Sequence, residues 1–96
     1  MIVELSEEAH RQVLEIDIWW RQNRLASPDL FSDELAAAVA KLEQMPTLGT
    51  QYEAANRTVR RVLLPRTHYH LYFVEEPERV FVVAVWSAFR GRGPRV

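Results

Sequence analysis

The sequence predicts an α+β fold in which a helical hairpin packs on a curved, mostly antiparallel β-sheet, in the order β-α-α-β-β-β. A short apolar run near the N-terminus is followed by two segments with apolar residues at helical spacing. Three β-rich runs then follow one another in residues 57–96, joined by two tight turns. A chain of 96 residues is long enough for one hydrophobic core, so we expect a single domain over residues 1–96.

The first strand and the first helix are predicted at residues 2–5 and 7–24. Residues 2–5 (IVEL) are a short, mainly apolar run, and Ser6 follows as an N-cap with two glutamates in the first helical turn, where negative charge interacts favourably with the helix dipole. The predicted buried face recurs at helical spacing and consists of Ala9, Val13, Ile16 and Trp20. Trp19 lies off this face, so it either widens the buried stripe or lines a groove for a partner.

A second helix is predicted to start at Ser27–Asp29, a serine-proline-aspartate segment. Serine is a preferred N-cap, proline is tolerated at the first helical position, and aspartate suits the N-terminal end of the dipole. The predicted buried face of this helix consists of Phe31, Leu35, Ala38, Leu42 and Met45. Pro46 ends the helix, and the short connection near residues 25–27 makes the two helices an antiparallel hairpin.

Three consecutive strands are predicted at residues 58–64, 69–75 and 79–86. Residues 46–57 contain Pro, Gly and Asn without any period and are expected to form a loop. The last strand contains the run VFVVAV, which is apolar on both faces. Such a run is typical of a central strand that is covered on both sides.

Charge is divided unevenly along the chain. Residues 1–56 hold four basic and ten acidic side chains, a net charge of −6, whereas residues 57–96 hold eight arginines and three glutamates, a net charge of +5. The overall charge of −1 argues against a stand-alone nucleic-acid-binding protein, because such proteins carry an excess of Lys and Arg. We therefore expect the basic half to meet a partner, without sequence-specific DNA binding by this chain.

The composition also indicates a compartment. The sequence contains no cysteine, which excludes disulfides, thiolate metal sites and cysteine nucleophiles. The N-terminus has neither the basic region nor the apolar region of a signal peptide, and no apolar run approaches the length of about eighteen residues needed to span a membrane. These features are typical of a cytoplasmic protein.

The candidate docking residues are concentrated in the basic half. Arginine presents a planar fork that suits bidentate contacts with carboxylates and phosphates, and tryptophan is a frequent interface anchor. The predicted partner-binding residues are Arg60, Arg61, Arg66, Trp86, Arg90 and Arg92. Arg60 and Arg61 are neighbours on one strand, so they should point to opposite faces of the sheet. The simpler interpretation of any one arginine is a solvated surface charge.

His68 and His70 lie two residues apart, so they are expected on the same face of a strand. They could act as metal ligands or as acid–base residues, but no third His or Cys clusters with them, and we expect no metal and no cofactor. The alternative is that His70 packs against the sheet and His68 lies in a turn. The sequence has no glycine-rich phosphate loop and no Ser-His-Asp set, so it does not predict a conventional hydrolase.

The order of elements and three sequence segments resemble the RelE/ParE toxin superfamily of bacterial type II toxin–antitoxin systems. The segments are the helix exit Leu42-x-x-Met45-Pro46-x-x-Gly49 and the runs VRRVLLPRTHYHLYFV and VFVVAVWSAFRGR, and the resemblance covers nearly the whole chain. It implies one of two activities. RelE-type members are ribosome-dependent endoribonucleases that cut mRNA, whereas ParE-type members inhibit DNA gyrase. In both branches a small antitoxin from the same operon neutralises the toxin, and its C-terminal segment wraps around it.

Within this superfamily the residues favour the ParE-like branch. RelE-type nucleases carry an arginine in a Tyr-Arg-hydrophobic triplet, where this chain has His70, and a late tyrosine that has no counterpart after Arg90. The resemblance then implies no catalytic residues, DNA gyrase as the target, and a hetero-oligomeric complex with a ParD-like, ribbon-helix-helix antitoxin. Two alternatives stay open: an mRNA endoribonuclease that uses His68, His70 and Arg90, and a non-toxic relative that only binds an antitoxin.

Overall fold

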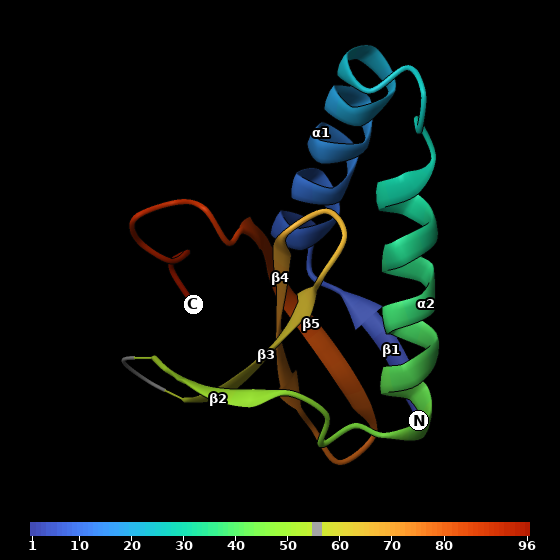
Figure 1. Cartoon of the computed structure of the whole chain (residues 1–96). Helices are drawn as coiled ribbons and strands as arrows, with labels where there is room; N and C mark the ends of the chain where they lie inside the picture. The colour runs from blue at the N-terminus through green and yellow to red at the C-terminus, as the bar shows by residue number, and fades with distance from the viewer. Residues whose placement is uncertain (55–56) are drawn as a thin grey trace.

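A computed structural model describes residues 1–54 and 57–96 as a helical hairpin packed on one face of a five-stranded, strongly twisted sheet (Figure 1). The elements are β1 (Ile2–Leu5), α1 (Glu7–Asn23), α2 (Leu30–Gln44), β2 (Thr50–Glu53), β3 (Thr58–Leu64), β4 (Tyr69–Glu75) and β5 (Arg79–Ser87). The strands lie in the order β1-β5-β4-β3-β2, with β1 parallel to β5 and the other neighbours antiparallel. The predicted α+β fold is confirmed, with one strand more than expected.

Both helices form where the helical period predicted them, but the second begins later than its capping sequence suggested. Ser6 caps α1 as predicted, because its hydroxyl oxygen accepts a hydrogen bond from Ala9 N at 3.0 Å. The N-cap of α2 is Asp29 and not Ser27. The Asp29 carboxylate makes no capping hydrogen bond and instead pairs with Arg21 of α1 at 2.8 Å, which ties the two helices together. Neither helix, in the part of the chain that the structure describes, is long and apolar enough to cross a membrane.

The segment after α2 was predicted to be a loop but contains a short strand. Met45, expected on the buried face of the second helix, is its C-cap and is 56% exposed. The strand β2 then pairs antiparallel with the first half of β3. The alternation of apolar and polar residues did not predict β2, because Tyr52 is the one apolar side chain of this strand. The Tyr52 ring packs edge-on against the ring of Tyr72, with ring centroids 4.9 Å apart. Residues 55 and 56 of the same predicted loop lie outside the described residues.

The sheet is covered on both faces. The helix-facing side forms the larger core, which includes Ala9, Trp20, Phe31, Leu42, Leu71, Phe73, Val80, Val82 and Val85. The opposite side, called the open face below because it is turned away from the helices, carries a second cluster formed by Val59, Tyr72, Val83 and Ala84. The C-terminal residue Val96 packs against this second cluster. Strand β5 is therefore buried on both sides, as its apolar run predicted, and Trp20 lies in the core, as its helical spacing predicted.

Candidate functional site

The open face carries most of the predicted docking residues. Cross-strand pairing aligns Leu63, His70 and Trp86 in one row, and Arg61 lies opposite Tyr72 in the next row. Leu63 is 44% exposed at the end of its row. Both helices lie on the other side of the sheet (Figure 1), so a partner would meet this face where β2 and the C-terminal tail leave it uncovered.

Aromatic rings flank Arg61 and His70 on this face. The guanidinium of Arg61 lies 5.2 Å from the centroid of the Tyr52 ring, within the range of a cation–π contact. The ring of His70 lies 5.9 Å from that of Tyr72. Burial, and secondarily the positive charge of Arg61, lowers the pKa of His70 below its ordinary value of 6.5. At pH 7 His70 is therefore mainly neutral, and Arg61 supplies the positive charge at this point.

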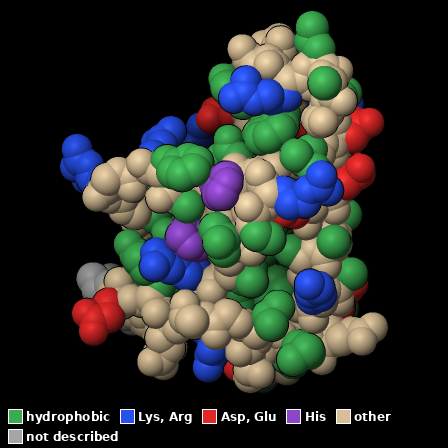
Figure 2. All heavy atoms as spheres, in the orientation of Figure 1, with side chains coloured by type: hydrophobic (Ala, Val, Ile, Leu, Met, Phe, Trp, Pro, Cys, Tyr) green, Lys and Arg blue, Asp and Glu red, His purple; other side chains and the backbone are tan. Residues whose placement is uncertain are grey.

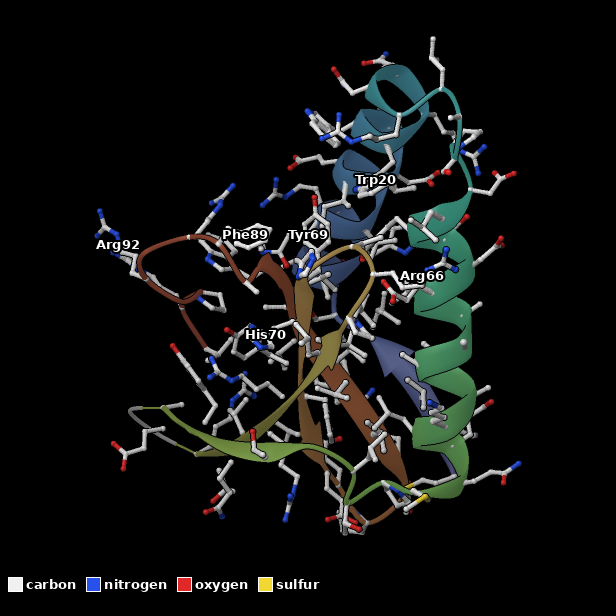
Figure 3. The ribbon with its side chains drawn as sticks, in the orientation of Figure 1. Trp20, Arg66, Tyr69, His70, Phe89 and Arg92 are labelled. Carbon is white, nitrogen blue, oxygen red and sulfur yellow. The ribbon has the colours of Figure 1, made fainter. Side chains whose placement is uncertain are left out.

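The C-terminal tail, residues 88–96, folds back over the open face and positions two arginines (Figure 3). The indole Nε1 of Trp86 donates a hydrogen bond to the backbone oxygen of Arg92 at 2.9 Å. The guanidinium of Arg90 lies 4.3 Å from the centroid of the Trp86 ring. Pro94 is buried, and Figure 3 shows the Arg92 side chain extending away from the body of the molecule. Trp86 therefore anchors the tail and presents its arginines to solvent.

A groove runs along the end of β5, between α1 and the tail. It comprises two hollows of ≈ 590 Å³ and ≈ 810 Å³, and Trp86 and Arg90 line both of them. Trp19, which is 43% exposed, lines the first hollow and so lies in a groove rather than in the core. The groove residues that the sequence did not reveal include Glu8, Arg11, Gln12, Glu15, Ile16 and Tyr69. Helical spacing defines a face of α1 but does not say which strand end that face meets.

Among the residues that the structure describes, the predicted docking arginines have no carboxylate partners. Every ion pair between residues that the structure describes involves Arg11, Arg21 or Arg79. The arginines without an ion pair there include all five predicted docking arginines, Arg60, Arg61, Arg66, Arg90 and Arg92. Lys and Arg side chains are scattered over the face seen in Figure 2, while Asp and Glu lie mainly at its margins. This surface can therefore receive carboxylates or phosphates.

The structure does not gather all of these arginines at one place. Arg61, Arg90 and Arg92 lie on the open face and its tail. Arg60 alternates to the helix-facing side of β3 and donates a hydrogen bond from its guanidinium to Gly49 O at 3.2 Å. Arg66 lies in the turn between β3 and β4, beside α2 (Figure 3). Arg60 and Arg66 therefore lie apart from the other three arginines.

His68 and His70 do not share a strand face, contrary to one prediction. His68 lies in the turn before β4 with a φ of 64°, and its ring packs against Phe89 with centroids 4.8 Å apart. Its N–H donates to Leu64 O at 2.8 Å, which closes the turn and keeps His68 out of the strand. The three residues of the nuclease alternative, His68, His70 and Arg90, each contact a different aromatic ring. Over residues 1–54 and 57–96, no group of three or more His, Cys, Asp or Glu side chains is arranged to hold a metal ion.

The fold and this surface define a small α+β domain that presents a basic face and an aromatic-lined groove to a partner. Residues 3–90 match the family described as ParE toxin of type II toxin-antitoxin system, parDE. Since this match spans most of the chain, the chain belongs to the ParE toxin family. Its fold is similar to that of a chain in the solved structure of the chromosomal ParDE TA system from P. aeruginosa, with a TM-score of 0.71 and 15% sequence identity over 91% of this chain and 95% of that one. No curated protein matches the sequence.

Proposed function

We propose that this chain is a ParE-like toxin that inhibits DNA gyrase and is neutralised by a ParD-like antitoxin. The observation that carries the proposal is a set of arginines that form no ion pair with any residue in 1–54 or 57–96, on a chain of the ParE toxin family. Guanidinium groups of this kind suit docking onto an acidic protein surface or onto phosphates. Gyrase is a cytoplasmic enzyme, so the proposal requires the chain to act in the cytoplasm.

Inhibition by docking needs no catalytic group in the toxin. Trp86 and Arg90 stack at the mouth of the groove beside α1, and Arg61 and Arg92 lie on the same side of the sheet. Aromatic and arginine side chains that become buried supply much of the energy of an interface, while charge complementarity speeds the encounter. A single partner on the open face would contact all four residues.

We propose that the antitoxin uses the same arginines. A partner with carboxylates opposite Arg61, Arg90 and Arg92 would satisfy guanidinium groups that have no ion pair within the described chain. The resulting hetero-oligomeric complex would cover the surface on which gyrase inhibition depends. Neutralisation then follows from competition for one surface.

An assay with purified gyrase and plasmid DNA tests the proposal. The chain is expected to block supercoiling and to accumulate linear DNA covalently linked to gyrase, and the antitoxin from the same operon should prevent both effects. The matched reaction in a translation extract should show intact mRNA. Cleaved mRNA with unaffected gyrase would replace this proposal with the endoribonuclease alternative. No effect in either assay, with retained antitoxin binding, would indicate a non-toxic relative.

A further inference from the structure

The C-terminal tail begins with an exposed phenylalanine. Phe89 lies just after the end of β5 and is 78% exposed. Figure 3 shows it at the surface of the molecule, between Tyr69 and Arg92. A single apolar side chain at the surface is ordinary and does not by itself indicate a binding site. Phe89 differs from an ordinary surface residue because its backbone is fixed and because docking residues surround it.

Three hydrogen bonds hold the backbone around Phe89. The N–H of Ala88 donates to His68 O at 2.8 Å, which ties the start of the tail to the turn between β3 and β4. The N–H of Phe89 donates to the Ser87 hydroxyl at 3.2 Å, and the N–H of Arg90 donates to Ser87 O at 3.3 Å. A side chain on a backbone held in this way loses little conformational freedom when a partner buries it.

The ring of Phe89 is supported by a second ring. His68 packs against it with ring centroids 4.8 Å apart and the ring planes tilted by 40°. This contact restricts the rotation of the Phe89 side chain, while most of its surface remains open to solvent. An aromatic side chain that is already positioned adds a large apolar area to an interface at a low cost in entropy. A partner therefore meets a preformed apolar projection.

Positive charge lies beside this projection. The guanidinium of Arg90 is held 4.3 Å from the centroid of the Trp86 ring, and Arg92 extends away from the body of the molecule (Figure 3). Neither arginine forms an ion pair with any residue that the structure describes. Trp86 and Arg90 also line the groove beside α1, so Phe89 is continuous with the docking surface. The matching partner surface is an apolar pocket with carboxylates at its rim.

We propose that Phe89 inserts into an apolar pocket of the target protein, whose acidic rim receives Arg90 and Arg92. Buried aromatic anchors within a ring of contacts that exclude water supply much of the affinity of protein interfaces. A protein is favoured over a nucleic acid as the occupant, because a net charge of −1 suits nucleic-acid binding poorly. The inference rests on the proposed inhibition of gyrase and adds the side chain that anchors the toxin to it.

A second exposed apolar residue supplies the matched control. Leu25 is 80% exposed and lies in the loop between α1 and α2, away from the sheet (Figure 1). In a supercoiling assay with purified gyrase, Phe89→Ala should raise the toxin concentration for half-inhibition by at least about tenfold, and Leu25→Ala should change it by less than about twofold. Phe89→Leu keeps the apolar bulk and should be impaired less than Phe89→Ala. Circular dichroism checks folding, and Phe89→Gln replaces Phe89→Ala, with the same expectation, if the alanine variant does not fold.

Calorimetric titration of the toxin into gyrase without DNA identifies the occupant. Phe89→Ala should weaken this binding by at least about tenfold, in parallel with its loss of inhibition. A defect that appears only with DNA present, and that is equal in Phe89→Leu and Phe89→Ala, would assign the ring to stacking on bases and overturn the proposal.

Unchanged inhibition by Phe89→Ala would also overturn it, including the case in which that variant loses affinity for the antitoxin alone. If the wild-type protein inhibits gyrase and Phe89→Ala inhibits it equally, only this inference fails. A wild-type protein that does not inhibit gyrase would remove the proposed function and this inference together.

Discussion

The side-chain oxygen of Gln12 accepts a hydrogen bond of 2.7 Å from the backbone N–H of Val85, in the buried interface between α1 and β5. Strand β1 pairs with β5 only as far as Val82, so α1 satisfies a peptide group that β1 does not reach. The bond lies at the base of the groove that Trp86 and Arg90 line. A buried glutamine thus fixes the strand end that carries the docking residues.

Removal of this acceptor should destabilise the fold. In Gln12→Met, which keeps the length of the side chain, the N–H of Val85 loses its partner, and we expect the free energy of unfolding to fall by about 1–3 kcal/mol. Gln22→Met, at an exposed position of the same helix, should change it by less than about 0.5 kcal/mol. Urea denaturation of both variants checks this. Equal denaturation midpoints for Gln12→Met and Gln22→Met would show that the Gln12 hydrogen bond contributes nothing to stability.

Glu34 should stabilise the turn between β3 and β4. Its carboxylate accepts hydrogen bonds from the N–H of Arg66, from the N–H of Thr67 and, at 2.6 Å, from the Thr67 hydroxyl. Because the group is partly exposed, we expect Glu34→Ala to cost about 1–2 kcal/mol of unfolding free energy. The neighbouring Asp33→Ala is the control, with little change expected. Thermal unfolding followed by circular dichroism measures the stability of both variants. If Asp33→Ala were as unstable as Glu34→Ala, the stabilising role of Glu34 in the turn would be refuted.

Two glycines of the tail should respond differently to alanine. A Cβ at Gly93 would overlap the hydroxyl of Tyr52, whereas a Cβ at Gly91 would meet nothing within 4 Å. Gly93→Ala is therefore expected to loosen the tail, with little effect on global stability because Gly93 is exposed. Trp86 fluorescence and the rate of carboxypeptidase trimming report the change. Trimming that is equally fast in Gly91→Ala and Gly93→Ala would mean that the tail is not seated on Tyr52.

The free energy of unfolding should decrease as the pH falls, in part because of His70. Burial, and then the charge of Arg61, lowers the pKa of His70 below 6.5, so over this range the unfolded chain binds more protons than the folded one. The contribution of His70 is fully present above about pH 6.5 and is lost as the pH falls towards the folded pKa. His70→Gln should remove this part of the slope, and Arg61→Gln should reduce it. Denaturation midpoints between neutral and mildly acidic pH test this, and a steeper slope in His70→Gln would contradict it.

The helical hairpin and the last three strands could be predicted because their side chains carry a clear period. Trp20 falls on a helical stripe, and the run from Val80 to Val85 is apolar on both faces, so burial follows from the pattern alone. The sequence predicts the cap of α2 at Ser27, whereas Asp29 is the N-cap and pairs with Arg21, a contact between helices that no local rule contains. Strand β2 was missed because backbone pairing, and not a hydrophobic period, defines it.

The candidate site was predictable as a set of residues but not as a surface. Alternation correctly separated Arg60 from Arg61, yet only the register of β3, β4 and β5 brings Arg61, His70 and Trp86 to one face. Strand β2 pairs with only Thr58–Arg61 of β3, and the sequence revealed neither this strand nor its short length. Sequence reasoning finds residue types, whereas clefts and edges arise from tertiary pairing.

The most direct test of the central claim is the antitoxin affinity of a variant with Arg61→Glu, Arg90→Glu and Arg92→Glu. Arg24→Glu is the control, since Arg24 is exposed at the far end of α1 and likewise forms no ion pair with any described residue. Calorimetric titration at low and high salt should show binding at least about tenfold weaker for the triple variant at low salt, with a smaller dependence on salt, while the control matches the wild type. Unchanged affinity in a folded triple variant would contradict the account.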